Sequence, residues 1–170
     1  MLERLIGVFK LDASVYEQIE HDENATMQAL IVVAIAGFLS GVGNGIGASL
    51  AGGNFFFSFI TIFVWAIIGW VIWAYITHFI GTRIIGGKGT VIGLMRGLGY
   101  AQAPLILGVV PCLGLVGLLW ALATGWMAVR QGLDLDNLQA VVAIVLGGLV
   151  YWIGLAVIIG AAGVTGLVSG

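Results

Sequence analysis

Long uninterrupted apolar stretches are the feature of this sequence that most restricts its fold. Residues Thr26–Leu50, Phe55–Ile80 and Leu138–Ile159 hold no Asp, Glu, Lys or Arg. A membrane core of about 30 Å is crossed by roughly 20 apolar residues in a helix, so each stretch is long enough to span it. With 61% hydrophobic and 8% charged residues and a mean hydropathy of +1.14, the chain is expected to be an all-α polytopic membrane protein.

The segment between residues 91 and 129 is long enough for one span or for two, and Arg96 is its only charged residue. Two spans, Val91–Val110 and Pro111–Val129, bring the total to five. All basic residues outside the spans then fall on one side, as the positive-inside rule requires: Arg4, Lys10, Arg83, Lys88 and Arg130. Four spans would place Arg130 on the other side. We therefore predict five transmembrane helices in the cytoplasmic (inner) membrane, with the N-terminus in the cytoplasm and the C-terminus outside.

Residues 1–25 are predicted to form a cytoplasmic amphipathic arm at the membrane interface. The apolar residues Leu2, Leu5, Ile6 and Phe9 recur at helical spacing. A break is expected near Leu11-Asp12, where Asp12 or Ser14 would cap a second helix. The polar face is acidic, which favours packing on the protein's own helices or on a partner over attraction to anionic lipid. Residues 26–160 then form the five-helix transmembrane domain, and residues 161–170 form a short Gly-rich tail.

Glu17, Glu20 and His21 lie on a common face of the arm, because they are three and four residues apart. They are weak candidates for a metal site, and a solvated polar face is the preferred interpretation. Cys112 is the only cysteine, so no internal disulfide and no Cys-based zinc cluster is possible. A net charge of -2 gives no basic surface for nucleic acid. We expect no bound cofactor.

The predicted spans lack the charges and catalytic groups of most transporters and enzymes. No acidic residue lies inside any span, and Ser40, Ser49 and Ser58 have no histidine near them in sequence. Glycines repeat every four residues at Gly37, Gly41 and Gly45, and again at Gly93 and Gly97, which predicts close helix packing. Polar residues such as Gln102 are expected to join helices by hydrogen bonds. Trp70 and Trp152 lie too near the middle of their spans for an interfacial aromatic belt.

At this point the sequence resembles the YIP1-domain family, in particular its prokaryotic branch. The stretches that carry the likeness are "FKLDASVYEQIEHDENATMQAL", "GTRIIGGKGT", "LMRGLGYAQAPLIL" and "LLWALATGWMAVRQGLDLDNLQAVVAIV". Gly99, Tyr100 and Pro104 are the most specific of these residues. The resemblance implies an N-terminal cytoplasmic segment, five membrane helices and association with membrane partners. The trafficking role of eukaryotic members is not carried over, because the acidic Tyr-Gly-Pro-containing segment that they have before the first span is not present.

One candidate site follows from the proline in the third predicted span. Pro104 is expected to kink the helix and to free backbone carbonyls near Arg96 and Tyr100. Arg96 is then a candidate to bind those carbonyls or a lipid phosphate, with a snorkelling side chain as the alternative. Arg83 is expected to anchor the preceding loop. Together Arg83, Arg96, Tyr100 and Pro104 form the predicted lipid or partner site.

Two functions remain open from the sequence. The first is a non-enzymatic membrane protein that acts by association, as a homo-oligomer or as an accessory or scaffold subunit of a membrane complex. Its partners would be the lipid bilayer and itself or another membrane protein, and no nucleic acid. The alternative is a small transporter or channel for a neutral or apolar solute or lipid, with the kinked third span lining the path.

Overall fold

The computed structural model describes the backbone of residues 1–168 and the side chains of residues 1–110 and 112–153. Over these residues the chain is all helical and forms no strand, so the predicted all-α class is confirmed. The α-helices are α1 (Leu2–Phe9), α2 (Ala13–His21), α3 (Ala25–Leu50), α4 (Phe55–Phe79), α5 (Val91–Tyr100), α6 (Gly114–Gly132) and α7 (Asn137–Val168). A π-helical turn, Ile80–Ile84, extends α4. Two 3-10 helices, Ala103–Val109 and Pro111–Leu113, connect α5 to α6.

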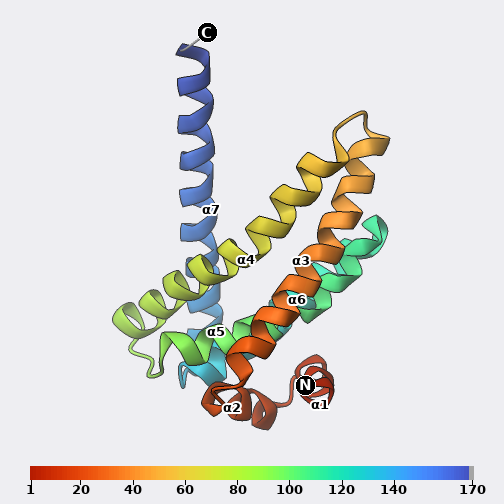
Figure 1. Cartoon of the computed structure of the whole chain (residues 1–170). Helices are drawn as coiled ribbons and strands as arrows, with labels where there is room; N and C mark the ends of the chain where they lie inside the picture. The colour runs from red at the N-terminus through yellow and green to blue at the C-terminus, as the bar shows by residue number, and fades with distance from the viewer. Residues whose placement is uncertain (169–170) are drawn as a thin grey trace.

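The long helices alternate in direction between two ends of the molecule (Figure 1). The arm end carries α1 and α2 together with the connections at residues 80–90 and 133–136. These two connections are joined directly, because the Lys88 amide donates to the Leu133 carbonyl at 2.8 Å. The far end carries the turns at residues 51–54 and 110–113. The turns that reverse the direction of the chain between long helices thus lie at one end or the other.

Two helices are individually long and apolar enough to cross a membrane, namely α3 and the Phe55–Ile84 helix formed by α4 and the π turn. Their bounds agree with the first two predicted spans. The helix α6 and residues Asn137–Ile153 of α7 pass the same test only as a pair, with a bend of 115° between them. The described residues therefore contain two candidate spans, or three if the bent pair is counted as one. The count of five stays a prediction.

The third predicted span, Val91–Val110, is not one continuous α-helix. α5 has 10 residues, which extend about 15 Å at 1.5 Å per residue, half of the membrane core. The chain then continues as a 3-10 helix to Val109. Pro104 explains the break, because it has no N–H for the carbonyl of Tyr100 and its ring would clash with that carbonyl. The change of geometry is larger than the kink that the sequence predicts.

The repeated glycines of α3 lie against α4. A Cβ atom added at Gly37 would lie 2.6 Å from the Cβ of Ala66, and one at Gly45 would lie 2.7 Å from the ring of Phe55. At Gly41 the added atom would lie 3.0 Å from the Phe59 ring. Since any side chain would push the helices apart at these positions, the glycines set the separation of α3 and α4.

Candidate functional site

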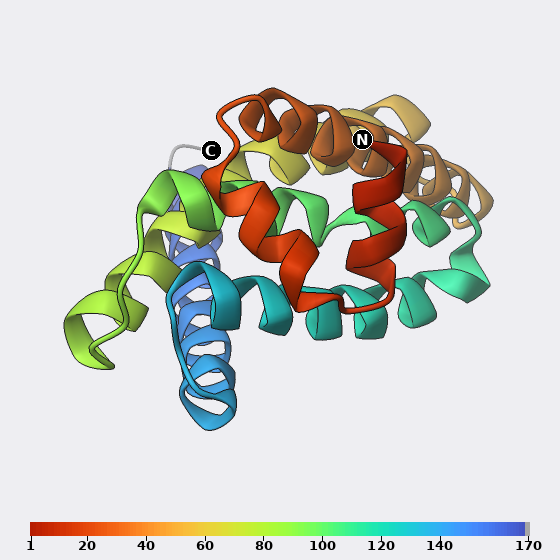
Figure 2. The same ribbon diagram turned by 90° about the horizontal axis from the view of Figure 1, so that it is seen from below.

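The arm packs on the bundle, and α1 and α2 cross its arm end (Figure 2). The break between them falls where the sequence predicts it, since Asp12 caps α2 by accepting from the Ser14 amide at 3.0 Å. Val8, Tyr16 and Ile19 are buried. The sequence predicts that the arm packs on the protein's own helices or on a partner. The buried residues show that it packs on the protein's own helices.

Tyr16 links the arm to the break in the third predicted span. Its hydroxyl donates to the Thr124 carbonyl in α6 at 3.1 Å, and the Thr124 hydroxyl donates to the Ala101 carbonyl at 2.8 Å. Ala101 directly follows α5, so Thr124 satisfies a buried carbonyl at the helix end. Burial raises the pKa of Tyr16, which keeps the phenol protonated as a hydrogen-bond donor.

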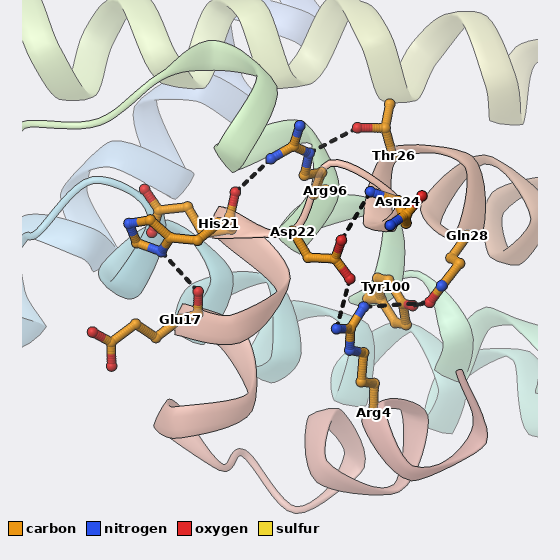
Figure 3. A network of polar contacts seen from close by, with 10 residues as sticks. Arg4, Glu17, His21, Asp22, Asn24, Thr26, Gln28, Arg96 and Tyr100 are labelled. Carbon is orange, nitrogen blue, oxygen red and sulfur yellow. Dashed lines mark hydrogen bonds and ion pairs between the residues drawn. The ribbon is translucent and has the colours of Figure 1, made fainter.

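Arg96 joins α5 to the arm and to the first turn of α3. Its Nε donates to the Thr26 hydroxyl at 2.7 Å, and its Nη1 donates to the Glu20 carbonyl at 2.6 Å (Figure 3). Glu20 lies in the last turn of α2, where the helix dipole is negative and carbonyls lack helical partners. Arg96 thus binds a backbone carbonyl, but the carbonyl comes from the arm and not from the kinked span.

A second set of polar contacts lies beside Arg96, as Figure 3 shows. Arg4 of α1 pairs with Asp22 at 2.7 Å, and the Tyr100 hydroxyl donates to the side-chain carbonyl of Gln28. Arg4 also reaches the same Gln28 oxygen at 3.5 Å. The hydrogen bond from Arg4 lowers the pKa of Asp22. Together these six side chains, which we call the arm latch, join α1, the α2–α3 junction and α5: Arg4, Asp22, Thr26, Gln28, Arg96 and Tyr100.

The predicted site residues are only partly brought together. Arg96 and Tyr100 belong to the arm latch, and Pro104 is buried in the following 3-10 helix. Arg83 lies exposed in the π turn and makes no ion pair with any described residue. The predicted four-residue site is therefore divided into an internal part and one exposed cation at the arm end.

The acidic face of the arm does not assemble as a metal centre. No group of three or more His, Cys, Asp or Glu side chains that could hold a metal occurs among the described residues. His21 donates from Nδ1 to the Glu17 carbonyl at 2.9 Å, a bond that raises the pKa of His21. The Glu20 side chain instead packs on α5, since a Cβ atom added at Gly93 would lie 2.7 Å from its Cγ. Burial raises the pKa of Glu20.

Sequence reasoning did not single out Arg4, Asp22, Thr26 and Gln28 as site residues. Arg4 was used only as a topological marker, although its position on α1 places it opposite Asp22. The one local signal is the placement of Thr26 and Gln28 in the first turns of an otherwise apolar span. The sequence did single out Gly97, which packs against α6. A Cβ atom added at Gly97 would lie 3.3 Å from the Cβ of Ala128.

Apolar helices of membrane-spanning length, joined at two ends, define an integral membrane protein of the helical class. A model of the Yip1 domain matches residues 6–159. The chain therefore belongs to the Yip1 domain family, as the resemblance indicated. Comparisons with curated proteins and with solved structures gave no match.

Proposed function

We propose that this protein is a non-enzymatic integral protein of the cytoplasmic membrane that acts by association with itself or with another membrane protein. We also propose that it belongs to the prokaryotic branch of the Yip1 domain family. It crosses the membrane five times, with the arm in the cytoplasm. Support for five crossings comes from the alternating helix directions and from the placement of the connections at two ends (Figure 1).

The observation that carries the association function is an apolar line on the outer side of α1. Leu2, Ile6 and Phe9 are 70%, 48% and 40% exposed, although the same short helix buries Val8. They are spaced four and three residues apart, so they lie along one face. The salt bridge of Arg4 and the docking of α2 hold this face in a fixed orientation. An apolar face that is fixed at the cytoplasmic end is suited to bind a partner.

The test is the composition of the tagged protein extracted from native membranes in a mild detergent. We expect a stoichiometric partner, or a second copy of the chain, to be retained by the wild type and lost from Ile6→Glu. Lys10→Ala is the matched control, since it changes an exposed residue next to the same helix. Isolation of the wild type as a monomer without a partner would contradict the proposal, and so would equal retention by Ile6→Glu.

The topology can be tested with the single cysteine of the chain. Cys112 is exposed and lies in the turn at the far end. Five crossings place it outside the cell, so a membrane-impermeant maleimide added to intact cells should label it. A four-span chain would bury Cys112 within one long span and leave it unlabelled. A cysteine introduced at Ser14 in a Cys112→Ser background should react only after the cells are permeabilised.

A groove at the far end favours transport of a neutral solute as the second candidate function. It has a volume of about 790 Å³ and includes Ser40, Asn44, Ser58 and Thr61 in its wall. Gly108 of the 3-10 helix also lines it, as the alternative from the sequence requires. Glycerol uptake into reconstituted vesicles is the measurement that discriminates the two. Uptake that Gly47→Leu abolishes would support transport, because Gly47 lines this groove.

A further inference from the structure

Four of the six tryptophans of the chain line one partly open cavity. Trp65, Trp70 and Trp73 come from α4, and Trp152 comes from α7. The cavity has a volume of about 450 Å³ and is closed on its other sides by α6 and by the break after α5. None of these tryptophans belongs to the arm latch, and an interfacial aromatic belt does not explain why the four lie together. Trp70 and Trp152, which lie too deep for a belt, therefore have a common location.

Small residues create the space between these rings. Gly69 admits the Tyr151 hydroxyl, since a Cβ atom at Gly69 would lie 2.5 Å from it. Gly148 faces open space, with no atom within 4 Å of the position that its Cβ would take. Leu122 and Leu149 line the cavity and are 49% and 52% exposed, so the cavity opens on the lipid-facing side of the protein. A molecule dissolved in the bilayer can reach it laterally.

The wall of the cavity restricts the chemistry of its ligand. None of the described residues that line it is charged, so a phosphate or ammonium headgroup would be desolvated there without a partner. Gln102 is the one side-chain amide on the wall, directly after the end of α5. Pockets of about 300 to 1,000 Å³ with aromatic walls and few polar groups are typical of small-molecule sites.

We propose that this cavity binds one neutral membrane lipid, a mainly apolar molecule whose single hydroxyl or carbonyl group bonds to the Gln102 amide. The tryptophan rings contact its hydrocarbon part, and the amide selects it over a pure hydrocarbon. This binding site is independent of the association function, which rests on α1 at the arm end.

The experiment uses the full-length protein in detergent and its own tryptophan fluorescence. Farnesol, a neutral prenyl alcohol, is the probe, and farnesene, the corresponding hydrocarbon, is the comparison. Wild-type protein should bind farnesol saturably and about five-fold more tightly than farnesene, as one net hydrogen bond contributes. Gly148→Leu should weaken both by about tenfold or more, because the new side chain displaces buried methylene groups of the ligand. Val141→Leu is the matched control, since Val141 is exposed on the same helix and does not line this cavity.

Gln102→Leu separates the polar contact from the apolar one. It should abolish the preference for the alcohol while leaving farnesene binding unchanged. If Gly148→Leu does not fold, as judged by its elution in gel filtration, Gln102→Leu still decides the proposal. A fluorescence change that never saturates in the wild type would overturn the site. Equal binding by wild type and a folded Gly148→Leu would overturn it too, and equal wild-type affinity for the two probes would overturn the role of Gln102.

Discussion

Replacing Arg96 by methionine should release the N-terminal arm without unfolding the bundle. Methionine keeps an unbranched chain of similar reach and removes the guanidinium. The substitution therefore deletes the bonds to the Glu20 carbonyl at 2.6 Å and to the Thr26 hydroxyl at 2.7 Å. The bond to the Glu20 carbonyl joins α5 to the arm, whereas the bond to Thr26 joins α5 to α3 within the bundle, so the loss at the arm contact is that of the Glu20 bond.

The size of the effect follows from the charge of the donor and from its partial burial. A hydrogen bond from a charged group contributes about 1.5 to 3 kcal/mol, and water competes for a part-buried one, so we take the lower value for the Glu20 bond. The one bond that joins the arm to the bundle gives about 1.5 kcal/mol, or about a tenfold change in the opening equilibrium of the arm.

Hydrogen exchange of the α2 amides measures this opening. We expect the amides of residues 16–21 to lose about tenfold in protection in Arg96→Met, while amides in the middle of α3 stay unchanged. Arg83→Met is the matched control, because Arg83 is exposed at the same end and has no ion-pair partner among the described residues. Equal protection in the two variants would refute the assignment of Arg96 to the arm latch. Thr26→Val added to Arg96→Met should have little further effect.

Two more predictions concern packing and pH. Gly43→Ala should lower the free energy of unfolding by about 1 to 3 kcal/mol, because the new Cβ would overlap the backbone carbonyl of Gly108. Gly47→Ala should be neutral or slightly stabilising, because Gly47 faces open space. Equal melting temperatures for the two variants would contradict this reading of the helix contact. Arg4 lowers the pKa of Asp22 below its ordinary 3.8. The Arg4–Asp22 ion pair therefore stabilises arm docking fully above pH 3.8, and this stabilisation is lost as the pH falls through the lower pKa that Asp22 has in the folded protein. Exposure of the arm to an acid-active protease should therefore rise below about pH 3.8 in the wild type, and Asp22→Asn should remove that contribution to the pH dependence.

The helices were predictable where a single physical signal dominates. Hydrophobic length fixed Thr26–Leu50 and Phe55–Ile80 to within one residue of α3 and α4. In the third predicted span a kink at Pro104 was expected, but hydropathy does not register that the α-helix ends at Tyr100 and that the chain continues as a 3-10 helix. Length and composition support two or three spans among the described residues, so charge placement remains the argument for five.

The candidate site was only partly predictable, because its contacts join residues far apart in the chain. Arg96 was singled out by its isolation in apolar sequence, and carbonyl binding was among the roles considered for it. Its partners Glu20 and Thr26 are 76 and 70 residues away, and no local pattern relates them to it. The pairing of Arg4 with Asp22 was not predicted for the same reason, because nothing in the sequence of the arm indicates which charged residues contact each other.

The contacts of the arm also set an order of events during synthesis. Tyr16 emerges from the ribosome 108 residues before the carbonyl of Thr124 to which it bonds. At about 5 to 20 residues per second, that interval is about 5 to 20 s, during which Val8, Tyr16 and Ile19 have no bundle to cover them. The arm can dock only after α5 and α6 are in place. Its docking is therefore a late assembly step, and a protease-resistant arm would mark chains whose insertion has reached α6.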